Sequence, residues 1–174
     1  PQSAGLQPLP APDAQGVIEL DGSEPYAATE IAAVGALTIR RSTAGQAVIV
    51  VRDRPLRIWA GRVVLDNVLI RSEAAEEALL VVDAQDLAMR RCTFLPADGT
   101  LPAAVVWSAL DPESATPQRL LARDSVFHGT GDALQIEAPA TMLELENVLK
   151  VGRGALIHLQ AAALDSPRPL VAKV

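Results

Sequence analysis

Short apolar runs recur along the chain, and within them apolar and polar residues alternate. The run from Leu37 to Arg40 is typical, because its two apolar residues stand one apart and a charged residue and a further polar residue follow. Alternation with a period of two predicts strands that bury one face. The pattern appears in five segments, at 37–42, 63–68, 87–92, 120–125 and 143–148.

These segments form a repeat. The polar residue near the end of each pattern stands at 41, 67, 91, 124 and 147, so the spacings are 26, 24, 33 and 23 residues. The interval of 33 residues contains a polar insertion with two prolines. Without this insertion the interval would match the shorter period of the other repeats. Each repeat also holds a second apolar run bounded by turn formers. These second runs lie at 47–51, 78–82, 103–107, 133–136 and 155–159.

Such a repeat predicts an all-β solenoid, a parallel β-helix of about five to six coils. Each coil stacks on the last at ~4.8 Å, because a single coil cannot bury its apolar side alone. A leucine-rich repeat fits less well, since Asn67 and Asn147 follow the last leucine by two positions rather than three. An α/β fold rests only on the helix formers at 72–78, which leave room for one helical turn.

Alternation also assigns the side chains of the first strand in each repeat. Those expected to point inward are Leu37, Ile39, Val63, Leu65, Leu87, Met89, Leu120, Ala122, Leu143 and Leu145. Those expected to point outward are Thr38, Arg40, Val64, Asp66, Ala88, Arg90, Leu121, Arg123, Glu144 and Glu146. Opposite charges then mostly meet on neighbouring coils, which predicts a ladder of ion pairs worth ~0.2–1 kcal/mol each.

Composition excludes several classes of protein. The 174 residues are 49% hydrophobic, which is enough for a core, and the formal net charge of −6 argues against nucleic acid as a partner. One cysteine and two histidines predict neither a disulfide nor a structural zinc site, and no cofactor is expected. No apolar run is long enough to span a membrane.

Prolines mark the expected domain boundaries. They gather near the two ends of the chain, which predicts a Pro-rich linker at 1–16, a β-helix domain at 17–164 and a C-terminal tail at 165–174. The chain begins at Pro1 without a signal-like segment, so we expect a piece of a longer protein, with a mature secreted protein as the alternative. An extracytoplasmic or envelope-associated location is slightly favoured.

The strand motifs, with the opening Val17–Tyr26 and the run Leu37–Arg40, resemble the right-handed parallel β-helix, or pectin-lyase-like, superfamily. More narrowly, the chain resembles uncharacterised β-helix domains of large bacterial multidomain proteins. The resemblance covers about residues 17–160 and implies a single-stranded, right-handed coil. It says little about function, because one scaffold hosts lyases, hydrolases, adhesins and inert spacers.

Catalysis has only weak candidates. The resemblance to polysaccharide lyases implies clustered aspartates for calcium, but Asp66 stands between two arginines that would compete with the ion. Glycoside hydrolases need two carboxylates around one cleft. The nearest match is Asp132 in a glycine-bearing turn with Asp124 eight residues earlier, and Glu137 or Glu146 could supply a further carboxylate. A turn at Asp132 explains the same residues without chemistry.

Binding has weak candidates as well. Trp107 precedes the insertion and is the best prospect for an exposed aromatic ring, although packing of the insertion over the core at this residue is favoured over ligand stacking. A small basic cluster around Pro55, formed by Arg52, Arg54 and Arg57, could hold an acidic polymer or simply be solvated. Cys92 is expected to be a small buried residue, and His128 and His158 are expected to be exposed and without metal, with His158 beside Gln135 of the previous coil.

These observations favour a non-catalytic β-helix module that acts as a structural spacer or as an interaction or adhesion surface in a larger bacterial protein. One alternative is a carbohydrate-active domain, either a polysaccharide lyase or a glycoside hydrolase, or a carbohydrate-binding domain. Another is a self-assembling module, because uncapped coil ends expose unpaired backbone. Polysaccharide and other domains of the same chain are the expected partners.

Overall fold

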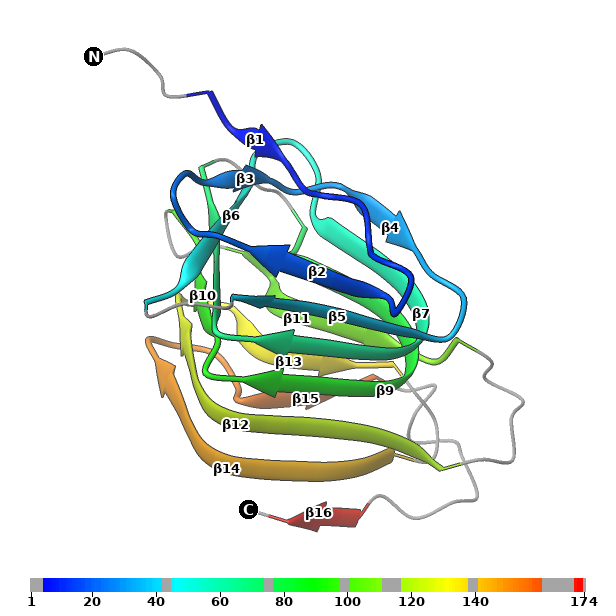
Figure 1. Cartoon of the computed structure of the whole chain (residues 1–174). Helices are drawn as coiled ribbons and strands as arrows, with labels where there is room; N and C mark the ends of the chain where they lie inside the picture. The colour runs from blue at the N-terminus through cyan, green and yellow to red at the C-terminus, as the bar shows by residue number, and fades with distance from the viewer. Residues whose placement is uncertain are drawn as a thin grey trace.

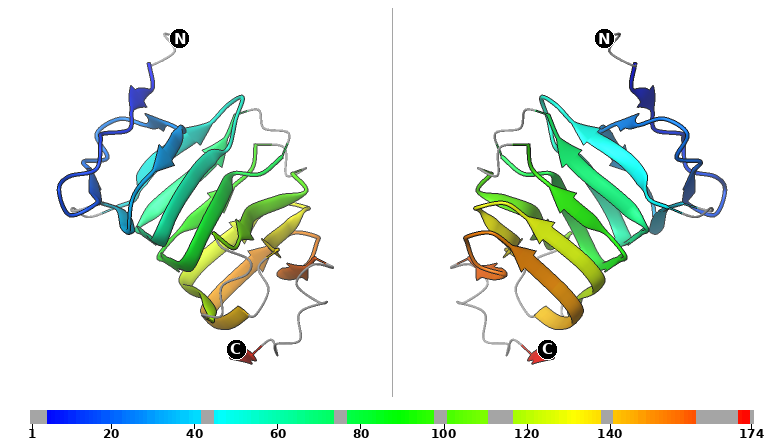
Figure 2. Two further views of the ribbon diagram at one scale, coloured as in Figure 1. Left: turned by 90° about the vertical axis from the view of Figure 1, so that its right-hand side faces the viewer. Right: turned by 90° about the vertical axis from the view of Figure 1, so that its left-hand side faces the viewer.

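The strands wind into a parallel β-solenoid of about five turns (Figure 1). The computed structural model of the chain describes residues 5–41, 45–73, 77–97, 101–110, 117–137, 141–160 and 171–173, and no helix occurs among them. Successive coils lie one below another in both views of Figure 2. The predicted all-β solenoid is therefore confirmed.

Each coil contributes strands to three faces, which we call A, B and C. Face A consists of β2 (Val17–Leu20), β5 (Ala36–Arg41), the second halves of β7 (Leu56–Asp66) and β9 (Leu80–Arg90), the first halves of β12 (Gln118–His128) and β14 (Thr141–Val151), and β16 (Val171–Lys173). Face B consists of β1 (Gln7–Pro8), β3 (Tyr26–Ala27), β6 (Ala47–Val51), β8 (Val68–Ser72), β10 (Thr93–Leu95) and the second halves of β12 and β14.

Face C consists of β4 (Glu30–Ala32), the first halves of β7 and β9, β11 (Ala103–Ser108), β13 (Asp132–Ile136) and β15 (Ile157–Leu159). The predicted repeat places all five second apolar runs at the same position, and this is wrong for one of them. The runs at 78–82, 103–107, 133–136 and 155–159 stack on face C, but the run at 47–51 pairs with β8 on face B. The sequence hid this strand, because β8 follows β7 after a single corner residue and looks like its continuation.

The recurring polar residues form the corner between faces A and B. Asn67, Arg91, Asp124 and Asn147 all have positive φ, at 60°, 53°, 51° and 52°. Asn and Asp tolerate this left-handed conformation better than most residues, which explains Asn67, Asp124 and Asn147, whereas Arg91 adopts it as an arginine. The equivalent polar residue of the first repeat, Arg41, instead ends strand β5.

The core is a set of side-chain columns that run along the stack. All ten residues predicted to point inward from the first strands are buried. On face B the buried column contains Phe94 and Phe127, whose rings stack with centroids 4.7 Å apart. Ala88 is in register with Val64 and Leu121 of the outward set but is only 7% exposed, because its small side chain lies between these larger neighbours.

The predicted charge ladder has the expected register but a different pairing. Arg40, Asp66, Arg90, Arg123 and Glu146 are aligned from coil to coil, and Glu19 extends the column. Asp66, however, pairs with the corner residue Arg91 at 2.7 Å instead of with its strand neighbours. The other ion pairs in this column join Arg40 to Glu19 at 2.6 Å and Arg123 to Glu146 at 2.5 Å.

The two ends of the described chain lie at opposite ends of the stack (Figure 1). β1 extends face B within the segment predicted to be a linker, and β16 extends face A within the predicted tail. The core of the insertion at 111–116, the proposed helical turn around 74–76 and most of the tail fall outside the described residues.

Candidate functional site

The outer side of face C carries two neighbouring columns of side chains. The first contains Arg57, Val81, Val106, Gln135 and His158. The second lies two residues further along each strand, because side chains on one face of a strand recur every second residue. It contains Trp59, Asp83 and Ser108, and Glu137 follows directly after the last residue of β13.

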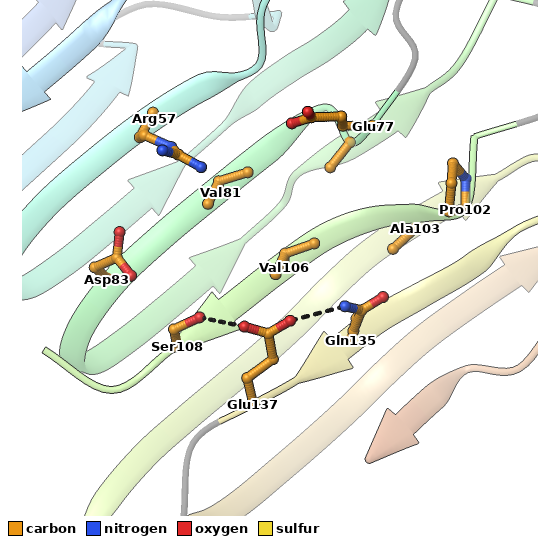
Figure 3. A pocket seen from close by; sticks show the side chains of 11 residues that line it. Arg57, Glu77, Val81, Asp83, Pro102, Ala103, Val106, Ser108, Gln135 and Glu137 are labelled. Carbon is orange, nitrogen blue, oxygen red and sulfur yellow. Dashed lines mark hydrogen bonds between the residues drawn. The ribbon is translucent and has the colours of Figure 1, made fainter. Parts of the chain in front are cut away.

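A hollow of about 530 Å³ lies over these columns (Figure 3). Its apolar part consists of Val81, Val106, Ala78, Ala103 and Pro102. Its polar part consists of Arg57, Glu77, Asp83, Ser108, Gln135 and Glu137. The site thus combines an aliphatic floor with polar groups at its rim, and three of its charged groups are carboxylates against one guanidinium.

Glu137 is held in place by two donors. The Ser108 hydroxyl donates to Oε2 at 2.8 Å, and the Gln135 side-chain amide donates to Oε1 at 2.9 Å (Figure 3). Its backbone N–H also donates to the carbonyl oxygen of Trp107 at 2.9 Å. The carboxylate therefore has a defined orientation at the rim.

Asp83 is half-buried and lies in register with Ser108. Burial raises the pKa of this carboxyl, the nearby charge of Glu137 raises it further, and the guanidinium of Arg57 opposes both effects. Among the described residues no side chain or backbone group forms a hydrogen bond with the Asp83 carboxylate. Asp83 is therefore a charge at the hollow that Arg57 influences from a distance and that no described residue holds by a hydrogen bond.

Arg57 is the cation of the hollow, and it lies over an aromatic ring. Its guanidinium carbon is 5.6 Å from the ring centroid of Trp59, a distance typical of cation–π contacts. The predicted basic cluster around Pro55 is divided. Arg52 and Arg54 line a separate hollow of about 430 Å³, and Arg52 also pairs with Glu73 at 2.8 Å.

The two candidate catalytic aspartates do not share a site. Asp124 occupies the corner between faces A and B, where its Oδ1 accepts from the side-chain amide of Asn147 at 2.7 Å. Asp132 begins β13 on face C. The second half of β12, Ser125–His128, lies between them and spans about 13 Å at the ordinary rise of a strand. Hydrolysis by this pair would require a much shorter separation.

Asp132 instead joins two coils. Its Oδ1 accepts from the backbone N–H of Ala155 at 2.8 Å, and its Oδ2 lies 2.7 Å from Nδ1 of His158. Burial acts to raise the pKa of Asp132, but these two contacts and the charge of Lys150 outweigh it, so the pKa is lowered. His158 lies beside Gln135 and is exposed, as predicted.

The prediction that Trp107 exposes its ring is wrong. The residue is 0% exposed, and its indole N–H donates to the carbonyl oxygen of Ala84 at 3.0 Å. Strand alternation explains the error, because Trp107 is in register with the buried Val82 and Ile136 and so points into the core.

Cys92 is buried, as predicted. Burial raises the pKa of its thiol to about 12, so the reactive thiolate is essentially absent at neutral pH. Within the described residues, no group of three or more His, Cys, Asp or Glu side chains is arranged to hold a metal ion. The same part of the chain includes no helix that is both long and apolar enough to cross a membrane.

Comparison with known proteins identifies no relative: no family model, curated protein or solved structure matches this chain. The β-solenoid therefore stands on the strand pairings alone. Membership of the pectin-lyase-like superfamily stays a prediction from the sequence.

Sequence reasoning missed most of the hollow on face C. The sequence pattern points to Glu137 only as a further carboxylate and does not single out Asp83 or Ser108, which line the hollow with it. Strand alternation could have found both, because buried Val82 and Trp107 imply that the residues after them point outward. Only the strand register shows that these residues meet across coils.

Proposed function

We propose that this chain is a non-catalytic β-solenoid module that acts as a rigid spacer within a larger protein, as its resemblance to modules of large bacterial proteins suggests. The observation that supports the proposal most directly is the position of the two ends. The described chain enters the stack at β1 and leaves it at β16, at opposite ends of the solenoid (Figure 1).

The length of such a spacer follows from its strands. On face A, six strand-to-strand steps lead from β2 to β16. At the ordinary strand spacing these steps span about 29 Å. Any segments attached to the two ends would be held apart by this distance.

The chemistry of the candidate residues also favours a structural role. Asp124, Asp132 and Arg52 each form a contact between neighbouring coils, while Cys92 and Trp107 are buried. The contacts of these side chains stabilise the stack. The carbohydrate-active alternative therefore gains no support from the residues that first suggested it.

Rigidity can be measured with spin labels at the two ends of the stack. We expect Gln15→Cys and Arg153→Cys, both at exposed positions, to accept nitroxide labels while the buried Cys92 does not react. Pulsed dipolar spectroscopy should then give one narrow distance distribution. The same labels in concentrated urea serve as the control and should give a broad one.

A broad distance distribution in native buffer would contradict a rigid spacer.

The absence of catalysis needs its own test, in which polygalacturonate, alginate and neutral glycans are incubated with the protein, with and without calcium. We expect no new reducing ends and no unsaturated products. Turnover by the purified protein that Glu137→Gln abolishes would overturn the non-catalytic part of the proposal.

A further inference from the structure

The hollow on face C has the chemistry of a site for a cation with an apolar stem. Val81 is 8% exposed and Val106 is half-buried, so they form a smooth aliphatic floor across two coils. Glu77, Asp83 and Glu137 surround it, and all three line the same cavity. A long aliphatic side chain that ends in a charge can contact such a floor and such a rim together.

The existing cation of the hollow does not neutralise these carboxylates. Arg57 contributes one positive charge, and its guanidinium lies over the ring of Trp59. Among the described residues no ion pair within 4 Å joins Arg57 to Asp83 or Glu137. Burial raises the pKa of Asp83, the charge of Arg57 lowers it only in part, and the charge of Glu137 adds to the rise, so a second cation in the hollow would lower this pKa further.

The carboxylate of Glu137 makes the hollow complementary to a cationic ligand. Its two oxygens already accept from Ser108 and Gln135, so the carboxylate is oriented before any ligand arrives. A carboxylate held by neutral donors keeps its full negative charge and still attracts a cation. Preorganisation of this kind lowers the entropy lost when a ligand binds.

We propose that this hollow binds a lysine side chain of a partner peptide, with the aliphatic stem on Val81 and Val106 and the ammonium group between Asp83 and Glu137. The net charge of −6 attracts a basic segment to the protein over longer distances. An acidic polymer is disfavoured at Arg57, because the same hollow holds three carboxylates.

The proposal is independent of the spacer role, since a rigid stack and an occupied face can each exist without the other. Fluorescence anisotropy with a labelled hexalysine peptide measures binding directly. The comparison peptide replaces lysine with diaminopropionic acid, which keeps an amino group on each side chain but removes most of the aliphatic stem. We expect hexalysine to bind about three- to tenfold more tightly, because only its stems reach the valine floor.

Two variants of strand β9 separate the hollow from general electrostatic attraction. Asp83→Asn removes one negative charge inside the hollow, and Asp86→Asn removes one negative charge from the outer side of face A. We expect Asp83→Asn to weaken hexalysine binding about three- to tenfold and Asp86→Asn to change it less than twofold. Circular dichroism checks that both variants keep the wild-type spectrum.

Equal losses in the two variants would overturn the proposal, because they would show attraction to net charge alone. Equal affinity for the two peptides would exclude the valine floor as a contact and would also overturn the proposal. Binding of a neutral oligosaccharide at the same hollow, competing with hexalysine and lost in Asp83→Asn, would assign the site to a different ligand. None of these outcomes changes the distance distribution that tests the spacer.

Discussion

At the scale of single residues, the corner between faces A and B makes the strictest demand on the sequence. Four consecutive coils turn there on one residue with positive φ. Asn67 and Asn147 meet this demand with a side chain that also forms a hydrogen bond, to the Gly45 carbonyl at 2.6 Å and to Asp124 at 2.7 Å. Arg91 adopts the same backbone conformation and pairs with Asp66.

Substitutions at Asn67 test this requirement. Both Asn67→Gly and Asn67→Val remove the hydrogen bond to Gly45, but only valine resists the left-handed conformation. We expect Asn67→Val to have a free energy of unfolding lower than that of Asn67→Gly by about 1 kcal/mol or more. Urea unfolding monitored by circular dichroism gives the comparison, and equal stability would mean that the corner tolerates any side chain.

At the scale of strands, each element is held mainly by its neighbours above and below. β15 is the last strand of face C and pairs with β13 over three residues. Asp132 supplements this short pairing through Ala155 and His158. The side chain therefore fastens the final coil to the one before it.

Removing this contact should loosen β15 specifically. We expect Asp132→Ala to speed amide hydrogen exchange of Ala155 roughly fivefold, because a hydrogen bond worth about 1 kcal/mol is lost. Asp132→Asn should have a smaller effect on Ala155, since its amide oxygen can still accept, but it loses the charge that faces His158. Exchange mass spectrometry measures both, and an effect spread evenly over all coils would contradict a local role.

The same contact predicts a dependence on pH. The pKa of Asp132 is lowered in the folded protein, so its ionised form contributes stability above the pKa of the unfolded state. That contribution is lost as pH falls through the folded pKa. We expect the difference in Ala155 exchange between wild type and Asp132→Ala, after correction for intrinsic rates, to vanish in strong acid.

At the scale of the whole molecule, the apolar column inside face B stops at a charged residue. The buried column on face B runs through Ile49, Ile70, Phe94 and Phe127, and the next residue in register is Lys150. Its ammonium group donates to the carbonyl oxygens of Gly129 at 2.5 Å and Arg153 at 2.6 Å. A charge in this position makes the coil that contains β14 a poor surface for another apolar coil.

We expect Lys150→Ile to promote association between molecules, because it continues the apolar column to the C-terminal end of the stack as the described residues form it. Arg153→Ile adds the same side chain at an exposed position near that end and serves as the control. Light scattering over a concentration series should show growth for Lys150→Ile and little change for the control. Concentration-dependent growth of the wild type would instead support the self-assembling alternative.

Alternation and a period of 23 to 26 residues can be read within single segments, so they are enough to predict the repeat, the parallel solenoid and the inward residues of the first strands. The same patterns predict the burial of Cys92 and the position of His158 beside Gln135. The folded chain was needed to show which runs share a face, that Trp107 points inward, and that Asp83, Ser108 and Glu137 meet in one hollow. Their meeting depends on the register between coils, and register arises from packing between segments about 25 residues apart rather than from any single segment.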